Sequence, residues 1–404
     1  MKLSLVVHAH QPPGNFDSVF HEGVDRCYGP FLDLLDEFDH VRASLHFSGS
    51  LLEWLERHAP ERVEQLRRLV ARGQVEPVAA GMYEPVLALL PAHDRAAQLR
   101  AHRSYLRRLF GVDTHTGWLT ERVWEPSLAA DLVDGGIDVV PLDERHFLSA
   151  GLRTEELTGA FVTEYQAKPL MIAPALEELR MSIPWRPVPE AVAMLRRHAA
   201  NGVELAVFGD DMEKFGMWPG TFRSVIRGGW LRRFFTALGR IEDEIELVPL
   251  GEAVAAAPPT RRVYIPDGSY PEMLGWSMTP RAQRELAATR ADLEQAGTWE
   301  RTEPFVHAGV YLQFLAKYPE ANHLHKRMLD VSHRVAARVE RRAGGRARAG
   351  EDEAALPEMQ RALWRAQANC AYWHGWFGGT YLPHLRHALW RSLLVSERAL
   401  EADG

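Results

Sequence analysis

Cysteine is scarce in this chain of 404 residues, which contains only Cys27 and Cys370. Because the two lie far apart in the sequence, no disulfide framework is expected, and a reducing cytoplasm is the predicted compartment. No apolar run approaches the length needed to span a bilayer. The N-terminal residues MKLSLVVHAHQPP carry one lysine and a short apolar run broken by histidines. They predict a first strand and not a signal peptide.

Long runs of one charge sign are also lacking. The formal net charge of −7 is spread along the chain, so neither a nucleic acid nor a membrane surface is predicted as a partner. The chain has instead an ordinary globular balance, 46% hydrophobic and 25% charged. One large barrel with an appended domain fits this length better than a single compact unit. The sequence leaves the oligomeric state open, and a homodimer is possible.

Strand and helix signals alternate over residues 1–277, which predicts parallel strands joined by helices, in a sheet or a barrel. Polar clusters follow several of the strands, where a β/α barrel has its active site. A long amphipathic helix is expected at 51–71 and another at 92–110. Strands are expected at 3–7, 42–47, 74–79, 116–119, 137–142 and 204–208, with a hairpin over 161–166 and 169–173.

From about residue 279 the pattern changes to helices alone, expected at 281–295, 304–317, 323–342, 357–371 and 384–402. We therefore predict two domains, a catalytic β/α barrel at 1–277 and a helical domain at 278–404. The stretch 369–382, NCAYWHGWFGGTYL, is too aromatic and too rich in glycine for an ordinary helix end. We expect it to fold back over the mouth of the barrel.

The stretch 117–126, GWLTERVWEP, combines Trp118, Trp124, Glu121 and Arg122 directly after a predicted strand. Indole rings, a carboxylate and a guanidinium make poor core material. Aromatic rings suit the apolar faces of sugars, and a carboxylate beside them can act as a nucleophile or an acid. The competing interpretation is a solvated loop with a Glu–Arg ion pair.

Cleavage of a glycosidic bond needs two carboxyl groups, and Asp211 in GDDMEKFG supplies a second one at the end of another predicted strand. The competing interpretation is a turn or helix-capping aspartate. A proton donor needs a raised pKa, which the neighbours Asp210 and Glu213 favour and Lys214 opposes. The sequence leaves the sign of this shift open.

His8 and His10 fall on one face of the first strand, because side chains alternate along a strand. They could hydrogen-bond sugar hydroxyls, or bind a metal as His-x-His pairs do in amidohydrolase-type enzymes. A metal needs further ligands at later strand ends, for which His146, Glu84 and Asp143 are candidates. We predict no metal and no other cofactor.

Five separated segments together resemble one known family: HAHQPPGNF (8–16), GQVEPV (73–78), WLTERVWEP (118–126), FGDDMEKFGMWPG (208–220) and AQANCAYWHGWFGGTYL (366–382). With these motifs in this order, the chain resembles glycoside hydrolase family 57, of the 4-α-glucanotransferase and α-amylase type. KYPEANHLHKRML (317–329) is similar to the helical region that follows the barrel in this subgroup. The motifs cover nearly the whole chain, so the resemblance is specific.

The resemblance implies an irregular seven-stranded parallel β/α barrel and a retaining double displacement on α-1,4-glucans or malto-oligosaccharides. It implies Glu121 as the nucleophile and Asp211 as the general acid/base, with carboxyl groups roughly 5–6 Å apart. Substrate-binding or supporting positions are His8, His10, Glu76, Trp118, Asp210, Glu213, Trp218 and Trp373. Reasoning from the residues alone would not choose Glu76 over Glu84, and both stay open.

Two residues depart from the family pattern. Met212 stands where the family usually has a small residue, so the loop that carries Asp211 is expected to differ in shape. Cys370 stands where the better-known glucanotransferases have an aspartate, so one sugar contact is expected to differ.

We predict a 4-α-glucanotransferase, with plain hydrolysis by an α-amylase as the close alternative. Aromatic rings on the acceptor side exclude water and favour transfer, and the expected rings are Trp124, Trp218, Tyr372, Trp373, Trp376 and Phe377. An inactivated glucan-binding barrel and a metal-dependent amidohydrolase are the less favoured alternatives.

Overall fold

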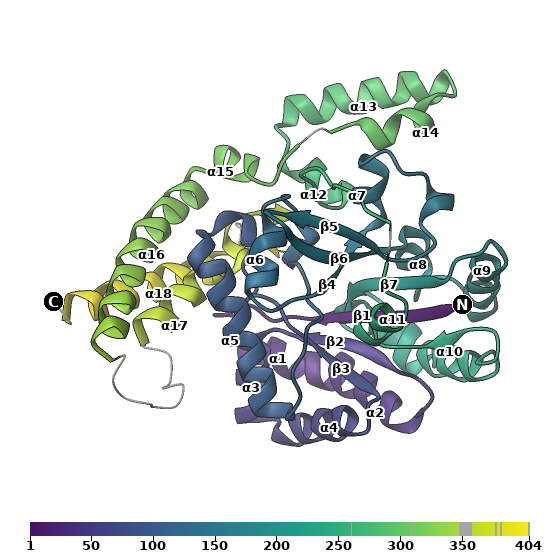
Figure 1. The fold of residues 1–404 in the computed structure, drawn as a ribbon, viewed down its shortest axis with the longest axis horizontal. Helices are drawn as coiled ribbons and strands as arrows, with labels where there is room; N and C mark the ends of the chain where they lie inside the picture. Colours follow the sequence, from purple (N-terminus) through teal and green to yellow (C-terminus); the bar gives the residue numbers. More distant parts are fainter. Residues whose placement is uncertain (260, 308, 347–357, 376–377, 380–381, 403–404) are drawn as a thin grey trace.

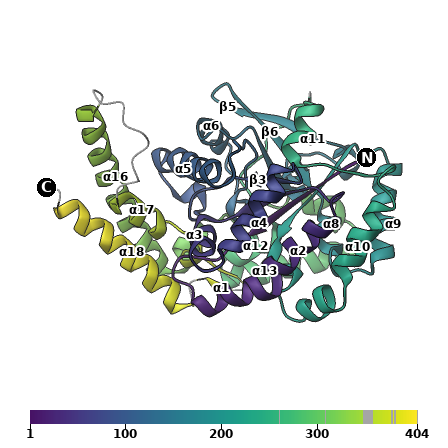
Figure 2. The same cartoon turned by 90° about the horizontal axis from the view of Figure 1, so that it is seen from below.

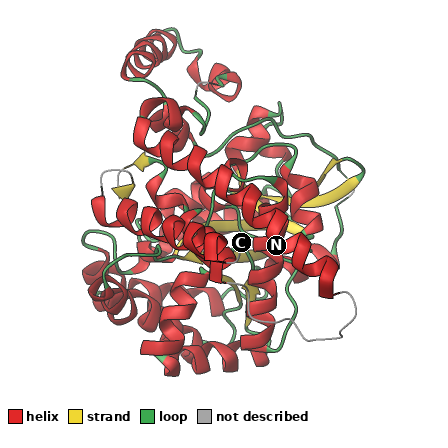
Figure 3. Ribbon diagram, turned by 90° about the vertical axis from the view of Figure 1, so that its left-hand side faces the viewer, coloured by secondary structure: helices red, strands yellow, loops and turns green. Residues whose placement is uncertain are grey.

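A computed structural model describes residues 1–402 apart from 260, 308, 347–357, 376–377 and 380–381. Its centre is a sheet of short strands, and helices surround this sheet (Figures 1 and 3). Among the described helices, none has the length and apolar character needed to cross a lipid bilayer.

The parallel strands close into a barrel. In hydrogen-bonded order they are β3 (Val75–Val78), β2 (Ala43–Phe47), β1 (Lys2–Ala9), β7 (Leu205–Asp211), β6 (Lys168–Ala175) and β4 (Val139–Asp143). The ring closes through Thr116, which bridges Val139, and Gly117, which bridges Ala79. These two residues are all that forms of the strand predicted at 116–119. With this bridged segment the barrel has seven parallel segments, so the predicted irregular seven-stranded barrel is confirmed.

Two further strands of this sheet lie outside the ring, and β9 (His374–Gly375) and β10 (Gly378–Gly379) form a separate antiparallel pair. β5 (Phe161–Tyr165) pairs antiparallel with β6, as the hairpin prediction requires, although β6 itself is a barrel strand. β8 (Glu246–Leu247) pairs with the start of β1. The strands β1 and β2 are buried along nearly their whole length, because side chains fill the barrel on one face and helices cover the other.

The helices of the barrel follow the predicted alternation, with one exception. The helix expected at 51–71 is two helices, α3 (Gly49–His58) and α4 (Pro60–Ala71), because Pro60 has no N–H with which to continue α3. Helix α5 (Ala92–Phe110) has the predicted bounds. The others are α1 (Asp17–Gly23), α2 (Gly29–Glu37), α6 (Leu128–Asp134), α7 (Glu144–Ser149), α8 (Glu177–Ser182), α9 (Val188–Ala200), α10 (Trp230–Gly239) and α11 (Leu250–Ala256).

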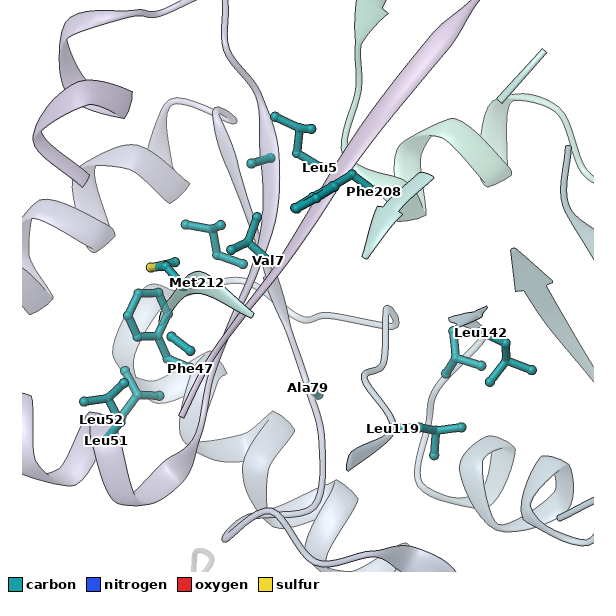
Figure 4. Close-up of a cluster of buried hydrophobic side chains, with 14 of the residues drawn as sticks. Leu5, Val7, Phe47, Leu51, Leu52, Ala79, Leu119, Leu142, Phe208 and Met212 are labelled. Atoms are coloured by element: carbon teal, nitrogen blue, oxygen red, sulfur yellow. The ribbon is translucent and has the colours of Figure 1, made fainter. Parts of the chain in front are cut away.

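The hydrophobic core lies between the strands and these helices (Figure 4). Val7 of β1, Phe47 of β2 and Leu51 of α3 are buried in it, together with Met212 from the loop after β7. Met212 is fully buried. Its larger side chain therefore fills core space under the loop that carries Asp211, while the acidic residues on either side of it line a cavity.

The C-terminal part is helical, as predicted, and its last three long helices pack against one another (Figures 1 and 2). Of the helix predicted at 304–317, the described residues form only the end of a 3-10 turn at Glu303–Phe305 and a short helix at Gln313–Lys317. The helices are α12 (Pro271–Ser277), α13 (Pro280–Gln295), α14 (Trp299–Thr302), α15 (Gln313–Lys317), α16 (Pro319–Arg346), α17 (Glu358–Ala366) and α18 (Pro383–Ala402).

Buried polar contacts join this helical part to the barrel. The Asp94 carboxylate at the start of α5 accepts hydrogen bonds from Ser332 of α16 at 2.6 Å and from Gln367 at 2.6 Å. Gln98 of α5 donates to the side chain of Gln367 at 2.6 Å. Because these groups are buried, losing any one partner would leave an unsatisfied polar atom. The network therefore fixes the helical part on α5.

Candidate active site

A cavity of about 700 Å³ lies at the carboxyl ends of β1 and β7, with walls from the 369–385 region. Eight of the ten predicted site residues line it: His8, His10, Glu121, Asp210, Asp211, Glu213, Trp218 and Trp373. The structure therefore brings together side chains that are up to 365 positions apart in the sequence, His8 and Trp373 being the outermost.

Trp118 supports the cavity from behind. It is almost fully buried, stacks on the His8 ring with 4.9 Å between ring centroids, and has the Arg122 guanidinium 5.4 Å above its ring. A direct sugar contact is therefore not its evident role. Its position holds two groups of the cavity wall in place.

The structure does not bring Glu76 to this cavity. Its carboxylate accepts hydrogen bonds from Ser44 at 2.6 Å, Thr116 at 2.6 Å and the Gly251 N–H at 3.2 Å. Glu76 lies inside β3, whereas Glu84 lies in the loop beyond the carboxyl end of that strand. Of the two glutamates left open by the sequence, Glu84 is therefore the one next to the site.

Glu121 is held in a strained turn. Glu121 and Arg122 have φ values of 54° and 47°, in the left-handed region that costs a non-glycine residue roughly 1–3 kcal/mol. Two hydroxyls fix the turn: Ser269 donates to the Glu121 carbonyl at 2.6 Å, and Tyr270 donates to Glu121 Oε2 at 2.6 Å. The carboxyl group therefore has one orientation in the cavity.

The surroundings of Glu121 include stabilisers of its charged form. Burial raises the pKa of the carboxyl above its usual value and Asp143 adds to the rise, while the Arg122 guanidinium and the hydrogen bond from Tyr270 act against it. Arg122 is itself held by Asp143, with Nε 2.8 Å from Oδ2, and lies 4.6 Å over the Tyr270 ring. A nucleophilic carboxylate needs such a fixed cation and donor.

Asp211 has more carboxylate neighbours than Glu121. Burial raises its pKa well above the usual value, and the neighbouring carboxylates, first of all Asp210, raise it further, against a lowering by Arg122. Lys214, which left the sign open in the sequence, forms an ion pair with Asp210 and donates to the Arg180 carbonyl at 2.6 Å. The direction of the shift is therefore upward, as a proton donor requires.

Glu213 lies next to Asp211 and carries a perturbed carboxyl too. Burial raises its pKa to about 7, although hydrogen bonds lower it, two of them from other residues. These come from the Tyr28 hydroxyl at 2.5 Å and the His10 N–H at 3.0 Å, both to Oε1. Glu213 thereby ties the end of β1 to the loop after β7.

The two predicted histidines point into the same cavity, and a third lies behind them. Burial lowers the pKa of His8, and that of His10 to about 3, so both rings are neutral. His8 Nδ1 lies 2.8 Å from Nδ1 of His46. This pair could not be predicted from the sequence, because it depends on the register that sets β1 beside β2.

His8, His46 and Glu84 are the one group among the described residues whose metal-ligand atoms lie within 4.8 Å of one another. An imidazole lone pair lies in the plane of its ring. The rings of His8 and His46 lie edge to edge, with their centroids 4.8 Å apart, an angle of 17° between their planes and the two Nδ1 atoms 2.8 Å apart, so the Nδ1 atoms point at each other and not at a common ion. The arrangement suits hydrogen bonds between the three side chains better than a tetrahedral ion.

The 369–382 stretch folds over the cavity as predicted, as far as it is described. Asn369, Cys370, Trp373 and Leu382 line the cavity. Cys370 Sγ lies 3.6 Å from His10 Nε2, and burial raises the pKa of this thiol. An uncharged thiol therefore stands where the family resemblance leads one to expect an aspartate.

The predicted aromatic acceptor wall is only partly correct. Trp218 and Trp373 line the cavity. Trp124 and Tyr372 do not, because both are buried in the core, where they donate to the carbonyls of Ile265 and Ala366. Trp376 and Phe377 lie outside the described residues.

Several site residues carry no signal that sequence reasoning used. Tyr270 and Trp276 come from a stretch without periodicity, and both line the cavity. Trp276 stacks on Trp373 with 5.9 Å between centroids, and Trp185 stacks on Trp218 with 6.0 Å. An aromatic residue in an aperiodic stretch just after a barrel was the available clue.

Comparisons with known proteins identify relatives of this chain. The sequence model of glycosyl hydrolase family 57 matches residues 4–266, and that of the α-amylase/4-α-glucanotransferase middle domain matches residues 309–400. The chain is 41% identical to a 4-α-glucanotransferase of Thermococcus litoralis over 98% of its own length, and 43% identical to an α-amylase of Pyrococcus furiosus over 96%. It spans 57% of the length of each of these relatives.

The fold agrees as well. The crystal structure of 4-α-glucanotransferase from Thermococcus litoralis superposes with a TM-score of 0.88 at 40% identity, covering 98% of this chain and 60% of that one.

Proposed function

Because this chain belongs to glycoside hydrolase family 57, we propose that it is a 4-α-glucanotransferase that acts on α-1,4-linked glucans by double displacement. One observation carries the proposal: Glu121 and Asp211 line one cavity, where burial raises the pKa of both but their neighbours differ. A cation and a hydroxyl favour the charge of Glu121, and neighbouring carboxylates disfavour that of Asp211. Such a division assigns the nucleophile and the acid.

In the first step the Glu121 carboxylate attacks the anomeric carbon, and the bond to the glycosidic oxygen breaks. That oxygen takes the proton of Asp211, and the released sugar leaves with it. In the second step the Asp211 carboxylate takes a proton from the 4-hydroxyl of an acceptor sugar, whose oxygen attacks the anomeric carbon and frees Glu121. Two displacements at one carbon retain the α configuration.

Transfer over hydrolysis requires a sugar, and not water, to reach the intermediate first. The two stacked pairs, Trp218 with Trp185 and Trp373 with Trp276, supply apolar faces that hold a glucose ring and displace water. Two relatives of similar identity are named a glucanotransferase and an α-amylase, so hydrolysis is the alternative outcome of the test below.

The proposal also assigns a role to each of two domains. Residues 1–277 form the catalytic barrel, and residues 278–404 form a helical domain that contributes Asn369, Cys370 and Trp373 to the active-site mouth. The middle-domain match at 309–400 supports this division. We also propose a cytoplasmic location, which the two free cysteines favour.

The test is incubation with maltotriose and resolution of the products over time. A transferase gives glucose together with chains longer than the input, with little net gain in reducing ends. If only shorter sugars appear, and reducing ends rise in step with cleavage, the enzyme is an amylase. Activity should survive exhaustive chelation; loss on chelation that zinc restores would instead favour the amidohydrolase alternative.

A further inference from the structure

Glu84 is a buried carboxyl group that the proposed double displacement does not use. It is 0% exposed, and its φ of 56° places it in the left-handed region. The Thr120 hydroxyl, next to Glu121, donates to Glu84 Oε2 at 2.9 Å. The Glu84 carbonyl accepts two hydrogen bonds from Asn369 in the lid-like 369–382 stretch. The position of Glu84 is therefore fixed from two sides of the cavity.

The other carboxyl oxygen of Glu84 faces a histidine. His46 Nε2 lies 3.2 Å from Glu84 Oε1, and among the described residues neither atom has a hydrogen-bond partner of good geometry, so each is the nearest available partner of the other. Both are buried, and a buried polar atom left unpaired costs roughly 1–3 kcal/mol. A proton shared between these two atoms is therefore expected.

Glu84, His46 and His8 lie in a row, and two neutral histidines in this row can place their hydrogens in only two ways. Each imidazole carries one hydrogen, because burial lowers the pKa of both His8 and His46. The two Nδ1 atoms lie 2.8 Å apart, so one of them donates and the other accepts. The choice decides the state of His8 Nε2: if His46 Nδ1 donates, His8 Nε2 carries a hydrogen, and if His8 Nδ1 donates, His8 Nε2 is bare.

The surroundings of Glu84 select between these two solutions. Burial raises its pKa well above the usual value, and the nearby carboxylates of Glu121, Asp211 and Glu213 act in the same direction. Thr120 donates to Oε2, so the acid hydrogen belongs on Oε1, where it points to His46 Nε2. His46 must then carry its own hydrogen on Nδ1 and give it to His8.

We propose that Glu84 and His46 are positioning residues that hold His8 in the tautomer with a hydrogen on Nε2, so that the edge of His8 in the cavity is a hydrogen-bond donor to the substrate. The proposal rests on the proposed function for the identity of that substrate, a glucan whose hydroxyl or ring oxygen accepts the bond. The tautomer itself is a property of the free protein. Tautomers of buried histidines are commonly fixed by the hydrogen bond at the far nitrogen in this way.

The direct test is ¹⁵N NMR of the free wild-type protein labelled at histidine, with the His8 and His46 signals identified by their loss in His8→Asn and His46→Asn. We expect the hydrogen on Nε2 of His8 and on Nδ1 of His46. A hydrogen on Nδ1 of His8 would overturn the proposal. Because no substrate is present, this result does not depend on whether the enzyme transfers or hydrolyses.

A matched pair of substitutions at Glu84 tests whether this residue sets the tautomer of His8 through His46. In Glu84→Gln the amide N–H₂ can donate to His46 Nε2 as the acid does, so the His8 tautomer and most of the activity should remain. In Glu84→Met, of similar length, this donor is gone, and we expect a mixed His8 tautomer. An unchanged His8 signal in Glu84→Met would show that Glu84 does not set the tautomer.

A second pair at His46 connects the tautomer to turnover. His46→Asn places an N–H donor toward His8 Nδ1 and keeps the proposed tautomer. In His46→Asp, whose side chain has nearly the same shape as asparagine, an acceptor takes that place and the His8 tautomer is reversed. We expect kcat/KM on maltotriose to fall less than roughly tenfold in the first and about a hundredfold or more in the second. Melting temperatures of both variants control for folding. Equal loss in two folded variants, or greater activity in His46→Asp, would overturn the donor role of His8.

Discussion

The barrel has a hollow at each end, and the two differ in the side chains that line them. The larger hollow, of about 930 Å³, is lined by residues from the amino ends of the strands, including Lys2, Glu204 and Glu246. It has no histidine and no aromatic ring among its described lining residues. The cavity of about 700 Å³ at the carboxyl ends has both, with carboxyl groups of raised pKa. Cavity volume therefore does not mark the site here; buried charge beside aromatic rings does.

Two glutamates make the same contrast at the level of single residues. The Glu76 carboxylate, inside β3, is surrounded by neutral donors from Ser44, Thr116 and Gly251. The Glu213 carboxyl faces other acids across the cavity, and its pKa is raised to about 7. Burial raises the pKa of both carboxyls. Three donors oppose the rise at Glu76, whereas Glu213 has two donors from other residues and Asp210 as a like-charged neighbour, so Glu213 is expected to cost more stability when it is charged.

The largest effect is expected on turnover, in a comparison of one substitution at each end of the barrel. Glu121→Ala should lower turnover by roughly 10⁴-fold or more while glucan binding stays nearly intact, because the covalent route is lost and the sugar subsites remain. Added azide should partly restore cleavage and give a β-glycosyl azide. Glu204→Ala, an exposed acid at the amino-end hollow, is the control and should keep wild-type activity. Full activity of Glu121→Ala would mean that another residue is the nucleophile.

A smaller effect is expected on stability. Because the folded pKa of Glu213 is about 7, above the unfolded value near 4.5, the folded protein binds more protons between these pH values. Stability is therefore lost as pH rises from about 4.5 to 7. Glu213→Gln removes this cost and should raise the free energy of unfolding by roughly 1–3 kcal/mol at pH 8, but not at pH 4.5.

The matched variant Glu76→Gln should do the opposite. Its amide N–H₂ replaces an acceptor that faces donors, so a loss of roughly 1–3 kcal/mol is expected at pH 8. Denaturant unfolding of both variants at the two pH values measures these changes. Equal destabilisation by the two substitutions would remove the distinction between a structural and a reactive carboxyl.

The sequence predicted the barrel well because its alternation is a local property. Helix α5 was predicted with its observed bounds, and the motif residues at the ends of β1 and β7 reached the cavity. The strand expected at 116–119 forms only two bridges, because the chain turns at Thr120 into the strained segment of Glu121. Strand propensity, which depends on neighbouring residues in the sequence, does not predict a turn that packing at the site imposes.

What the sequence missed depended on distance through space. Trp124 shares the motif of Glu121, yet its ring turns into the core and binds the Ile265 carbonyl. Tyr270, in a stretch without periodicity, supplies the hydrogen bond to Glu121. The motif alone favoured Glu76 over Glu84. In the structure Glu76 lies inside β3 beside Ser44, whereas Glu84 lies in the loop after that strand. Such positions follow from tertiary packing, which a pattern of neighbours does not encode.

The smallest effect concerns the acceptor wall. Trp218→Ala should shift the products toward hydrolysis by roughly 2- to 10-fold, because an aromatic face of this kind contributes about 0.5–1.5 kcal/mol. The ratio of new reducing ends to transferred glucose on maltotriose measures the shift. Phe305→Ala removes an exposed ring that does not line the cavity, and it should leave the ratio unchanged. An unchanged ratio in Trp218→Ala would mean that this ring does not hold the acceptor.

The most direct test of the catalytic assignment is to trap the sugar on the protein. α-Maltosyl fluoride has a leaving group that needs no proton, so the Asp211→Asn variant should complete the first step and stall without a base for the second. Intact mass and peptide mapping then locate the bound sugar. The account predicts one maltosyl group on Glu121. Fluoride release without protein-bound sugar, or a maltosyl group on Glu84 or another carboxyl, would contradict it.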